Sequence, residues 1–150
     1  MPELIRYRGV VYQRVAASSL LARVNALRSQ LAGAAQKVVD VWEQDDEGFD
    51  CELGGGGPCD EVARELQGVL SDAGINSIEG GHEGDDHAWL IAYDERTKEL
   101  VGVDIPPGVY ETGGGYKWTK LEDTTVTPSD VAVWPINEKF DDVIDPDMLY

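Results

Sequence analysis

The sequence holds three residues whose types and order could perform nucleophilic acyl transfer: Cys59, His87 and Asp104. This chemistry needs a nucleophile, a base within hydrogen-bond reach of it, and a third group that orients the base. Cys59 follows Pro58 and opens an apolar stripe of helical spacing, so we expect it at the start of a helix. The helix dipole stabilises a thiolate there, and free backbone N–H groups, such as that of Cys59, could form an oxyanion hole.

The register of a predicted β-hairpin indicates whether the side chains of His87 and Asp104 can come into contact. Aromatic and β-branched residues predict a strand, a turn and a returning strand over residues 87–94, 95–98 and 99–105. Pairing of Asp94 with Glu99 places Asp104 opposite Trp89 and diagonal to His87. Because side chains alternate between the two faces of a strand, His87, Trp89 and Asp104 then share one face. The geometry therefore permits a His–Asp pair.

The other elements follow from apolar periodicity and from turn residues. Ser18 and Ser19 offer N-cap chemistry for one long amphipathic helix from about Ser19 to Gln44. Gly74 is placed to end the Cys59 helix as its C′ residue. Further strands are expected within residues 9–15, 75–79, 116–121 and 130–136. Helices followed by an antiparallel meander predict an α+β fold.

Length and charge limit the possible partners. With 150 residues and 16.4 kDa, residues 1–150 are expected to form a single domain, whose acidic tail, residues 137–150, is loosely held. The apolar content of 42%, with four Trp and six Tyr, excludes a wholly disordered chain. A net charge of −17 repels phosphate backbones and anionic lipids, so we expect no nucleic acid and no membrane as partner.

The cysteines and the N-terminal residues indicate a compartment. Residues 1–15 contain no apolar stretch of signal-peptide length, and the longest apolar run, Ala88–Tyr93, is far below the ~20 residues of a membrane helix. Two cysteines without a secretion signal favour reduced thiols and a cytoplasmic location. A Cys51–Cys59 disulfide is the alternative. The oligomeric state does not follow from these features.

The motif residues together resemble those of a known family, the transglutaminase-like branch of the papain-like cysteine hydrolases. The resemblance covers residues 55–107 and rests on Gly57-Pro58-Cys59, Asp72-Ala73-Gly74-Ile75, His87-Ala88-Trp89 and Val103-Asp104. It implies a papain-like core in which Cys59 is the nucleophile, His87 the base and later the general acid, and Asp104 the orienting carboxylate. The implied enzyme is a peptidase, amidase, deamidase or transglutaminase that acts on a peptide or amide substrate without a cofactor. Water is the simplest acceptor, so hydrolysis is favoured.

Departures from the family pattern favour a second hypothesis, a non-catalytic binding or assembly module that keeps the same fold. Ile105 separates Asp104 from the prolines, and no Gln or Trp shortly before Cys59 offers a second oxyanion donor. Asp60 and Glu61 oppose thiolate formation. Cys59 could equally be an apolar core residue, since cysteine is among the most buried residue types.

Two further sets of residues complete the candidates. A zinc protein is a third hypothesis, with the ligands Cys51, Cys59, His82 and His87, but their spacing departs from that of structural zinc sites and we predict no metal. The candidate substrate-binding aromatics are Trp89, Tyr110 and Trp118. Tyr110 and Trp118 are preferred for a cleft because they lie on or near glycine-rich loops, although such aromatics are more often core residues.

Overall fold

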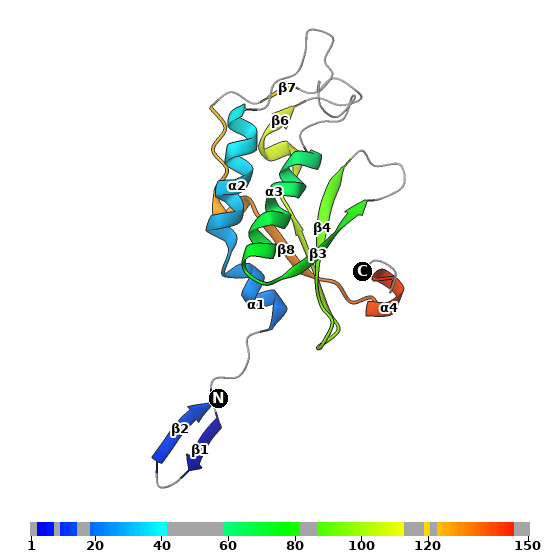
Figure 1. Cartoon of the computed structure of the whole chain (residues 1–150). Coiled ribbons are helices and arrows are strands. Elements are labelled where there is room, and N and C mark those ends of the chain that lie inside the picture. The colour runs from blue at the N-terminus through cyan, green and yellow to red at the C-terminus, as the bar shows by residue number, and fades with distance from the viewer. Residues whose placement is uncertain are drawn as a thin grey trace.

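The structure is a computed structural model that describes residues 3–7, 10–14, 19–41, 59–81, 87–112, 119–120 and 123–145. Its strands are β1 (Glu3–Tyr7), β2 (Val10–Arg14), β3 (Asn76–Gly81), β4 (Ala88–Asp94), β5 (Glu99–Asp104), β6 (Glu111–Thr112), β7 (Thr119–Lys120) and β8 (Ala132–Pro135). Its helices are α1 (Leu20–Asn25), α2 (Arg28–Val41), α3 (Cys59–Asp72) and α4 (Phe140–Val143), with short 3-10 helices η1 (Pro107–Val109) and η2 (Pro128–Asp130). Figure 1 shows their arrangement.

A four-stranded antiparallel sheet in the order β3-β4-β5-β8 carries the fold (Figure 1). Strands β4 and β5 form the expected hairpin, in which Asp94 pairs with Glu99 and Leu90 pairs with Val103. Strand β8 adds to β5 on the other side. The α+β class and the register of the hairpin are therefore confirmed.

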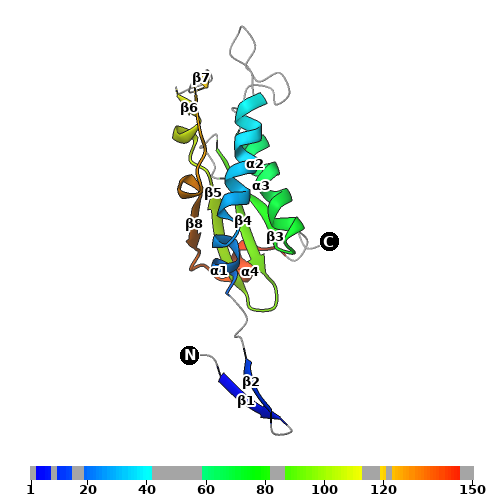
Figure 2. The same ribbon diagram turned by 90° about the vertical axis from the view of Figure 1, so that its left-hand side faces the viewer.

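Helices α1, α2 and α3 cover one face of this sheet, as the two views in Figures 1 and 2 show. Along β4 and β5, every second side chain points toward the helices and is apolar. The apolar stripe of α3 packs against these side chains. Both sets belong to one buried cluster, which includes Val62, Leu66, Leu70, Leu90, Ala92, Val101 and Val103. Removal of this apolar surface from water is what holds α3 against the sheet.

Helix α3 ends as its sequence predicts. Gly74 has φ +77°, a backbone conformation that glycine adopts without steric cost. Its N–H donates to the carbonyl of Ser71 at 2.9 Å, and the N–H of Ile75 donates to the carbonyl of Leu70 at 2.8 Å. These two bonds form a Schellman motif, and buried Leu70 and Ile75 are its apolar partners.

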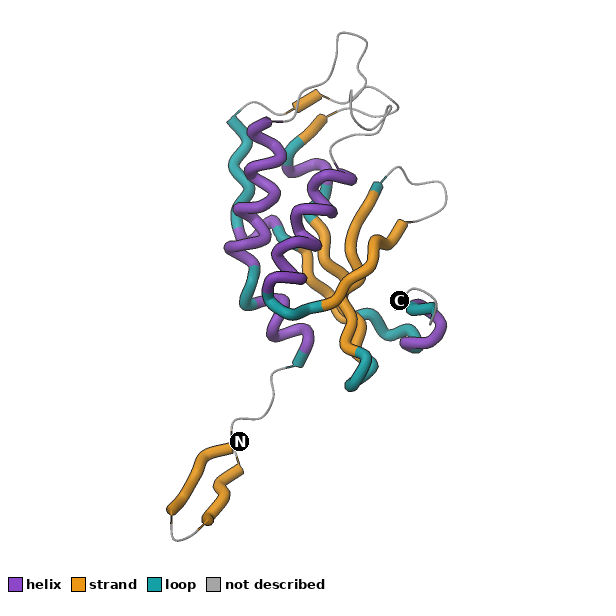
Figure 3. Tube along the Cα trace, viewed as in Figure 1, coloured by secondary structure: helices purple, strands orange, loops and turns teal. Residues whose placement is uncertain are grey.

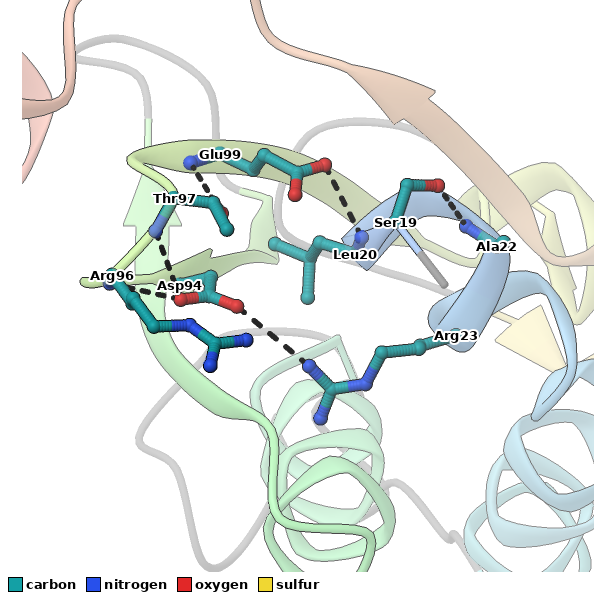
Figure 4. A network of polar contacts seen from close by, with 8 residues as sticks. All are labelled: Ser19, Leu20, Ala22, Arg23, Asp94, Arg96, Thr97 and Glu99. Carbon is teal, nitrogen blue, oxygen red and sulfur yellow. Dashed lines mark hydrogen bonds and ion pairs between the residues drawn. The ribbon is translucent and has the colours of Figure 1, made fainter. Parts of the chain in front are cut away.

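The single long helix expected from Ser19 to Gln44 is wrong, because α1 ends at Asn25 and α2 begins at Arg28. Ser19 does cap α1, and its hydroxyl accepts a hydrogen bond from the backbone N–H of Ala22 at 3.1 Å (Figure 4). The Arg28 guanidinium bonds to the side chain of Asn25 and to the backbone carbonyls of Pro128 and Val131. The apolar stripe continues across this break, so periodicity alone gives no sign of it. The expected end near Gln44 lies outside the described residues.

A polar network joins α1 to the β4–β5 turn (Figure 4). Glu99 accepts a hydrogen bond from the N–H of Leu20 at 3.2 Å, which places a carboxylate at the helix N-terminus, where the dipole favours it. Asp94 accepts hydrogen bonds from two successive backbone N–H groups of the turn, at 2.9 and 3.2 Å, and lies 3.8 Å from Arg23. The turn that sets the hairpin register is thus held by its own hydrogen bonds to Asp94 and by the contacts of Asp94 and Glu99 with α1.

Helix α4 packs on the other face of the sheet, away from α2 and α3 (Figure 3). Phe140 is 7% exposed and Ile144 is 1% exposed, and both join a second apolar cluster with Ile91, Tyr93 and Leu100. The expectation of a loosely held tail is wrong for this part of the chain, because two well-spaced apolar residues among the acids anchor it. Met148, Leu149 and Tyr150 lie outside the described residues.

The remaining strands form two small sheets, β1 with β2 and β6 with β7. Strand β2 matches the strand expected within residues 9–15, whereas β1, which pairs with it antiparallel, was not expected. Only Thr119–Lys120 of the strand expected over residues 116–121 is described. Within the described part of the chain, no helix has both the length and the apolar character that a bilayer crossing requires.

Candidate active site

His87 and Asp104 form a direct pair at one end of the sheet. His87 immediately precedes β4, and Asp104 is the last residue of β5. The imidazole Nε2 of His87 lies 2.9 Å from both Oδ1 and Oδ2 of Asp104. The two side chains are 22% and 16% exposed, so the pair is screened from bulk water without being sealed from it. This bond orients the ring and leaves Nδ1 for another partner.

Cys59 lies next to this pair. It is the first residue of α3, is 6% exposed and belongs to the main apolar cluster. Its side chain is a thiol, and it interacts with the imidazole of His87. The structure therefore brings together the three residues that the sequence singled out. Cys51, the other half of the alternative disulfide, lies outside the described residues.

The Nδ1 atom of His87 is buried and, among the described residues, has no partner with hydrogen-bond geometry. The Cys59 thiol interacts with this imidazole and raises its pKa. A buried polar atom without a hydrogen bond costs free energy, so it calls for a physical explanation. Because Nε2 is held by Asp104, Nδ1 is the nitrogen available to exchange a proton with sulfur.

The hydrogen bond to Asp104 is the main reason why the pKa of His87 rises from 6.5 to about 10. The contact with Cys59 and the two partners' charges raise this pKa further, and burial opposes them. The ring is therefore an imidazolium across neutral pH. An imidazolium held in this way can donate its proton to a reacting group.

Asp60, the residue after Cys59, interacts with Glu79. Burial raises the pKa of Glu79 on β3, and so do the charge of Asp60 and a hydrogen bond that the protonated Glu79 donates to the Asp60 carboxylate, while the Arg64 guanidinium opposes the shift. Asp60 is thus engaged with Glu79.

The three aromatic residues predicted to bind substrate differ in burial and in whether the structure describes them. Trp89 is half-buried on the sheet and its ring centroid lies 5.4 Å from that of Trp134. Tyr110 is 1% exposed within the main core, so it is a packing residue and not the cleft side chain we preferred. Trp118 lies outside the described residues. Trp134, which the sequence analysis did not single out, could have been found from its alternation with Ala132 along β8.

The zinc and oxyanion hypotheses involve residues that the structure does not describe. Cys51 and His82 are two of these, as are the positions directly before Cys59, where a second oxyanion donor would lie. Among the described residues, no group of three or more His, Cys, Asp or Glu side chains could hold a metal ion. The backbone N–H of Cys59, at the start of α3, remains the candidate oxyanion donor.

Compared with known proteins, the chain matches no protein-family model, no curated protein and no solved structure. The inference of function therefore depends on the motif residues and on the geometry described above.

Proposed function

We propose that the chain is a cysteine-dependent acyl-transfer enzyme that acts on an amide bond through Cys59, His87 and Asp104. The observation that carries this proposal is the His87 ring, which is held by Asp104 through Nε2 and also interacts with Cys59. Packing alone gives no reason for a buried imidazole nitrogen in a strand-end histidine that also interacts with a thiol. The approach of a helix N-terminus and two strand ends supports a papain-like, transglutaminase-like core.

In the proposed reaction, the Cys59 thiolate attacks the amide carbonyl carbon, and the backbone N–H of Cys59 binds the developing oxyanion. The His87 imidazolium donates its proton to the amide nitrogen, the C–N bond breaks and an amine leaves. The neutral imidazole then takes a proton from water, whose oxygen attacks the thioester. Sulfur leaves as thiolate and a carboxylic acid is released. Asp104 orients the ring and stabilises its charge throughout.

The test is the rate at which a peptide-based thiol electrophile labels Cys59, located by mass spectrometry in a Cys51→Ser background. We expect rapid labelling that His87→Ala slows by about a hundredfold, because the imidazolium no longer favours the thiolate. Cys59→Ser is the control for labelling elsewhere. Equal rates with and without His87, in variants that retain their circular dichroism, would refute an activated nucleophile.

A non-catalytic binding module is the second candidate, and the burial of Cys59 favours it. Cys59 is only 6% exposed and belongs to the main apolar cluster. If this candidate is right, the native protein resists the electrophile at Cys59 and becomes labelled there only after unfolding.

A further inference from the structure

Strands β1 and β2 form a hairpin that stands apart from the main sheet. They pair with each other in an antiparallel register and make a two-stranded sheet of their own. In both views this β1–β2 hairpin lies beyond the start of α1, away from the four-stranded sheet and from α4 (Figures 1 and 2). An isolated two-stranded hairpin is only marginally stable in water, so it gains from a further surface to pack on.

The charge of the N-terminal segment is opposite to that of the remainder of the chain. Residues 1–18 contain three arginines and a single acid, so their net side-chain charge is +2. Of the 12 basic and 29 acidic residues of the whole chain, 9 and 28 are thus left for residues 19–150, a net charge of −19. The four charged residues of the N-terminal segment are Glu3, Arg6, Arg8 and Arg14. The segment therefore suits an acidic surface.

An acidic surface with an exposed indole lies around α4. Trp134 is 36% exposed, and its ring centroid lies 5.4 Å from that of Trp89, which packs against the cluster of Phe140 and Ile144. Four exposed acids and one exposed lysine, Lys139, follow Trp134 within residues 137–145. We call Trp134 and these acids the α4 surface; the acids are Glu138, Asp141, Asp142 and Asp145.

The residue types of the hairpin fit both parts of the α4 surface. A guanidinium group binds carboxylates with paired hydrogen bonds, and it also stacks on an indole face. The hairpin sequence includes apolar and aromatic residues as well, which an indole can pack against. These residues are Ile5, Tyr7, Val10, Val11 and Tyr12.

We infer that the β1–β2 hairpin of one copy docks on the α4 surface of a second copy, which docks its own hairpin in return. Every copy carries both surfaces, so this exchange closes as a two-fold dimer and uses each surface once. Repulsion between the two acidic bodies is screened over about 8 Å at physiological ionic strength, whereas the hairpin contact is local. The inference does not depend on the proposed function.

The test is sedimentation velocity of the full chain at about 0.15 M salt, with a reducing agent present. We expect a dimer for the wild type, and a dissociation constant at least about tenfold higher for Arg6→Glu combined with Arg8→Glu. Lys37→Glu combined with Arg64→Glu is the matched control. It changes the net charge equally at two exposed residues of α2 and α3, on the other face of the sheet from α4, so the dimer should persist.

A charge reversal on the other side of the contact completes the test. Glu138→Lys combined with Asp141→Lys should also give a monomer. In an equimolar mixture of this variant with Arg6→Glu/Arg8→Glu, each hairpin meets an α4 surface of opposite charge, so a heterodimer should form. If the α4 variant loses its circular dichroism, the hairpin variant and its control still decide the outcome.

A monomeric wild type would overturn the inference, because the hairpin then packs on its own chain or binds a different acidic partner. A wild-type dimer that survives the charge reversal in the hairpin would also overturn it, as would a mixture of two folded variants that stays monomeric.

Discussion

The imidazole Nε2 of His87 lies 2.9 Å from both carboxylate oxygens of Asp104, 17 positions further along the chain. The two residues are diagonal across the β4–β5 hairpin, whose register follows from the pairing of Asp94 with Glu99. A slip of one residue would turn Asp104 to the other face of the sheet. The candidate site thus depends on a turn that lies at the opposite end of both strands.

The pKa of His87 makes stability depend on pH in a defined direction. The folded pKa is about 10 and the unfolded value is 6.5, so the native state binds the proton more tightly. The stabilisation is complete below pH 6.5 and is lost as pH rises through about 10. We expect Asp104→Asn to be less stable than the wild type by about 1.5–3 kcal/mol at pH 6, and this difference to shrink toward pH 10. Urea unfolding at several pH values measures it.

The comparison between the wild type and Asp104→Asn cancels the titration of other groups over this range. A stability difference that stayed constant from pH 6 to pH 10 would contradict the assigned shift.

Removal of the carboxylate should also lower the reactivity of Cys59. With Asp104→Ala the ring loses its orientation and its largest source of a raised pKa, so less imidazolium faces the sulfur at pH 8. We expect alkylation of Cys59 to slow by about tenfold to a hundredfold, and Asp104→Asn, which keeps an acceptor oxygen, to slow it less. The rates are measured by quenching the alkylation at set times and quantifying the modified Cys59 by mass spectrometry. Identical rates for the wild type and the alanine variant would remove Asp104 from the mechanism.

The packing of Trp134 over Gly102 predicts a severe local clash. A Cβ at position 102 would lie 2.2 Å from the indole, so Gly102→Ala should cost about 1–3 kcal/mol of unfolding free energy. Trp134→Ala removes the obstacle, and the double variant should recover most of that loss. Gly108→Ala is the matched control, because nothing lies within 4 Å of the added Cβ. Equal costs at positions 102 and 108 would show that the indole does not lie over Gly102.

Two glycines at α3 should respond in opposite directions to alanine. Gly68 is inside the helix with open space around it, so Gly68→Ala should stabilise the protein by about 0.5–1 kcal/mol. Gly74 has φ +77°, which alanine adopts at a cost, so Gly74→Ala should destabilise it by about 1–2 kcal/mol. Thermal unfolding of both variants measures the contrast. The same sign for both would be inconsistent with the C-terminal geometry of α3.

Local patterns predicted much of the fold because each has a short-range cause. The C′ role of Gly74, the N-cap of Ser19 and the register of the hairpin depend on residues within a few positions of one another. The break between α1 and α2 was missed because it coincides with hydrogen bonds from Arg28 to carbonyls about a hundred residues away. Such long-range contacts leave no mark on the apolar period.

The parts of the candidate site that depend on local sequence were predictable, and the parts that depend on tertiary packing were not. The face shared by His87 and Asp104 follows from alternation, and the start of α3 from Pro58 and Cys59. Burial of Tyr110 was not predictable, because a core tyrosine and a cleft tyrosine next to a glycine-rich loop have the same local sequence. The partial exposure of Trp134 depends on which distant segments pack over β8, which is a tertiary property.

The pH dependence of Cys59 alkylation by iodoacetamide tests the central claim most directly. Measured in the Cys51→Ser background with and without His87→Ala, the ratio of the two rates reports the effect of the imidazolium on the sulfur. We predict a ratio of about a hundred near pH 6–7 that falls toward one as pH approaches 10, where the imidazolium loses its proton and an ordinary thiol is already ionised. A ratio of one throughout this range would contradict the account.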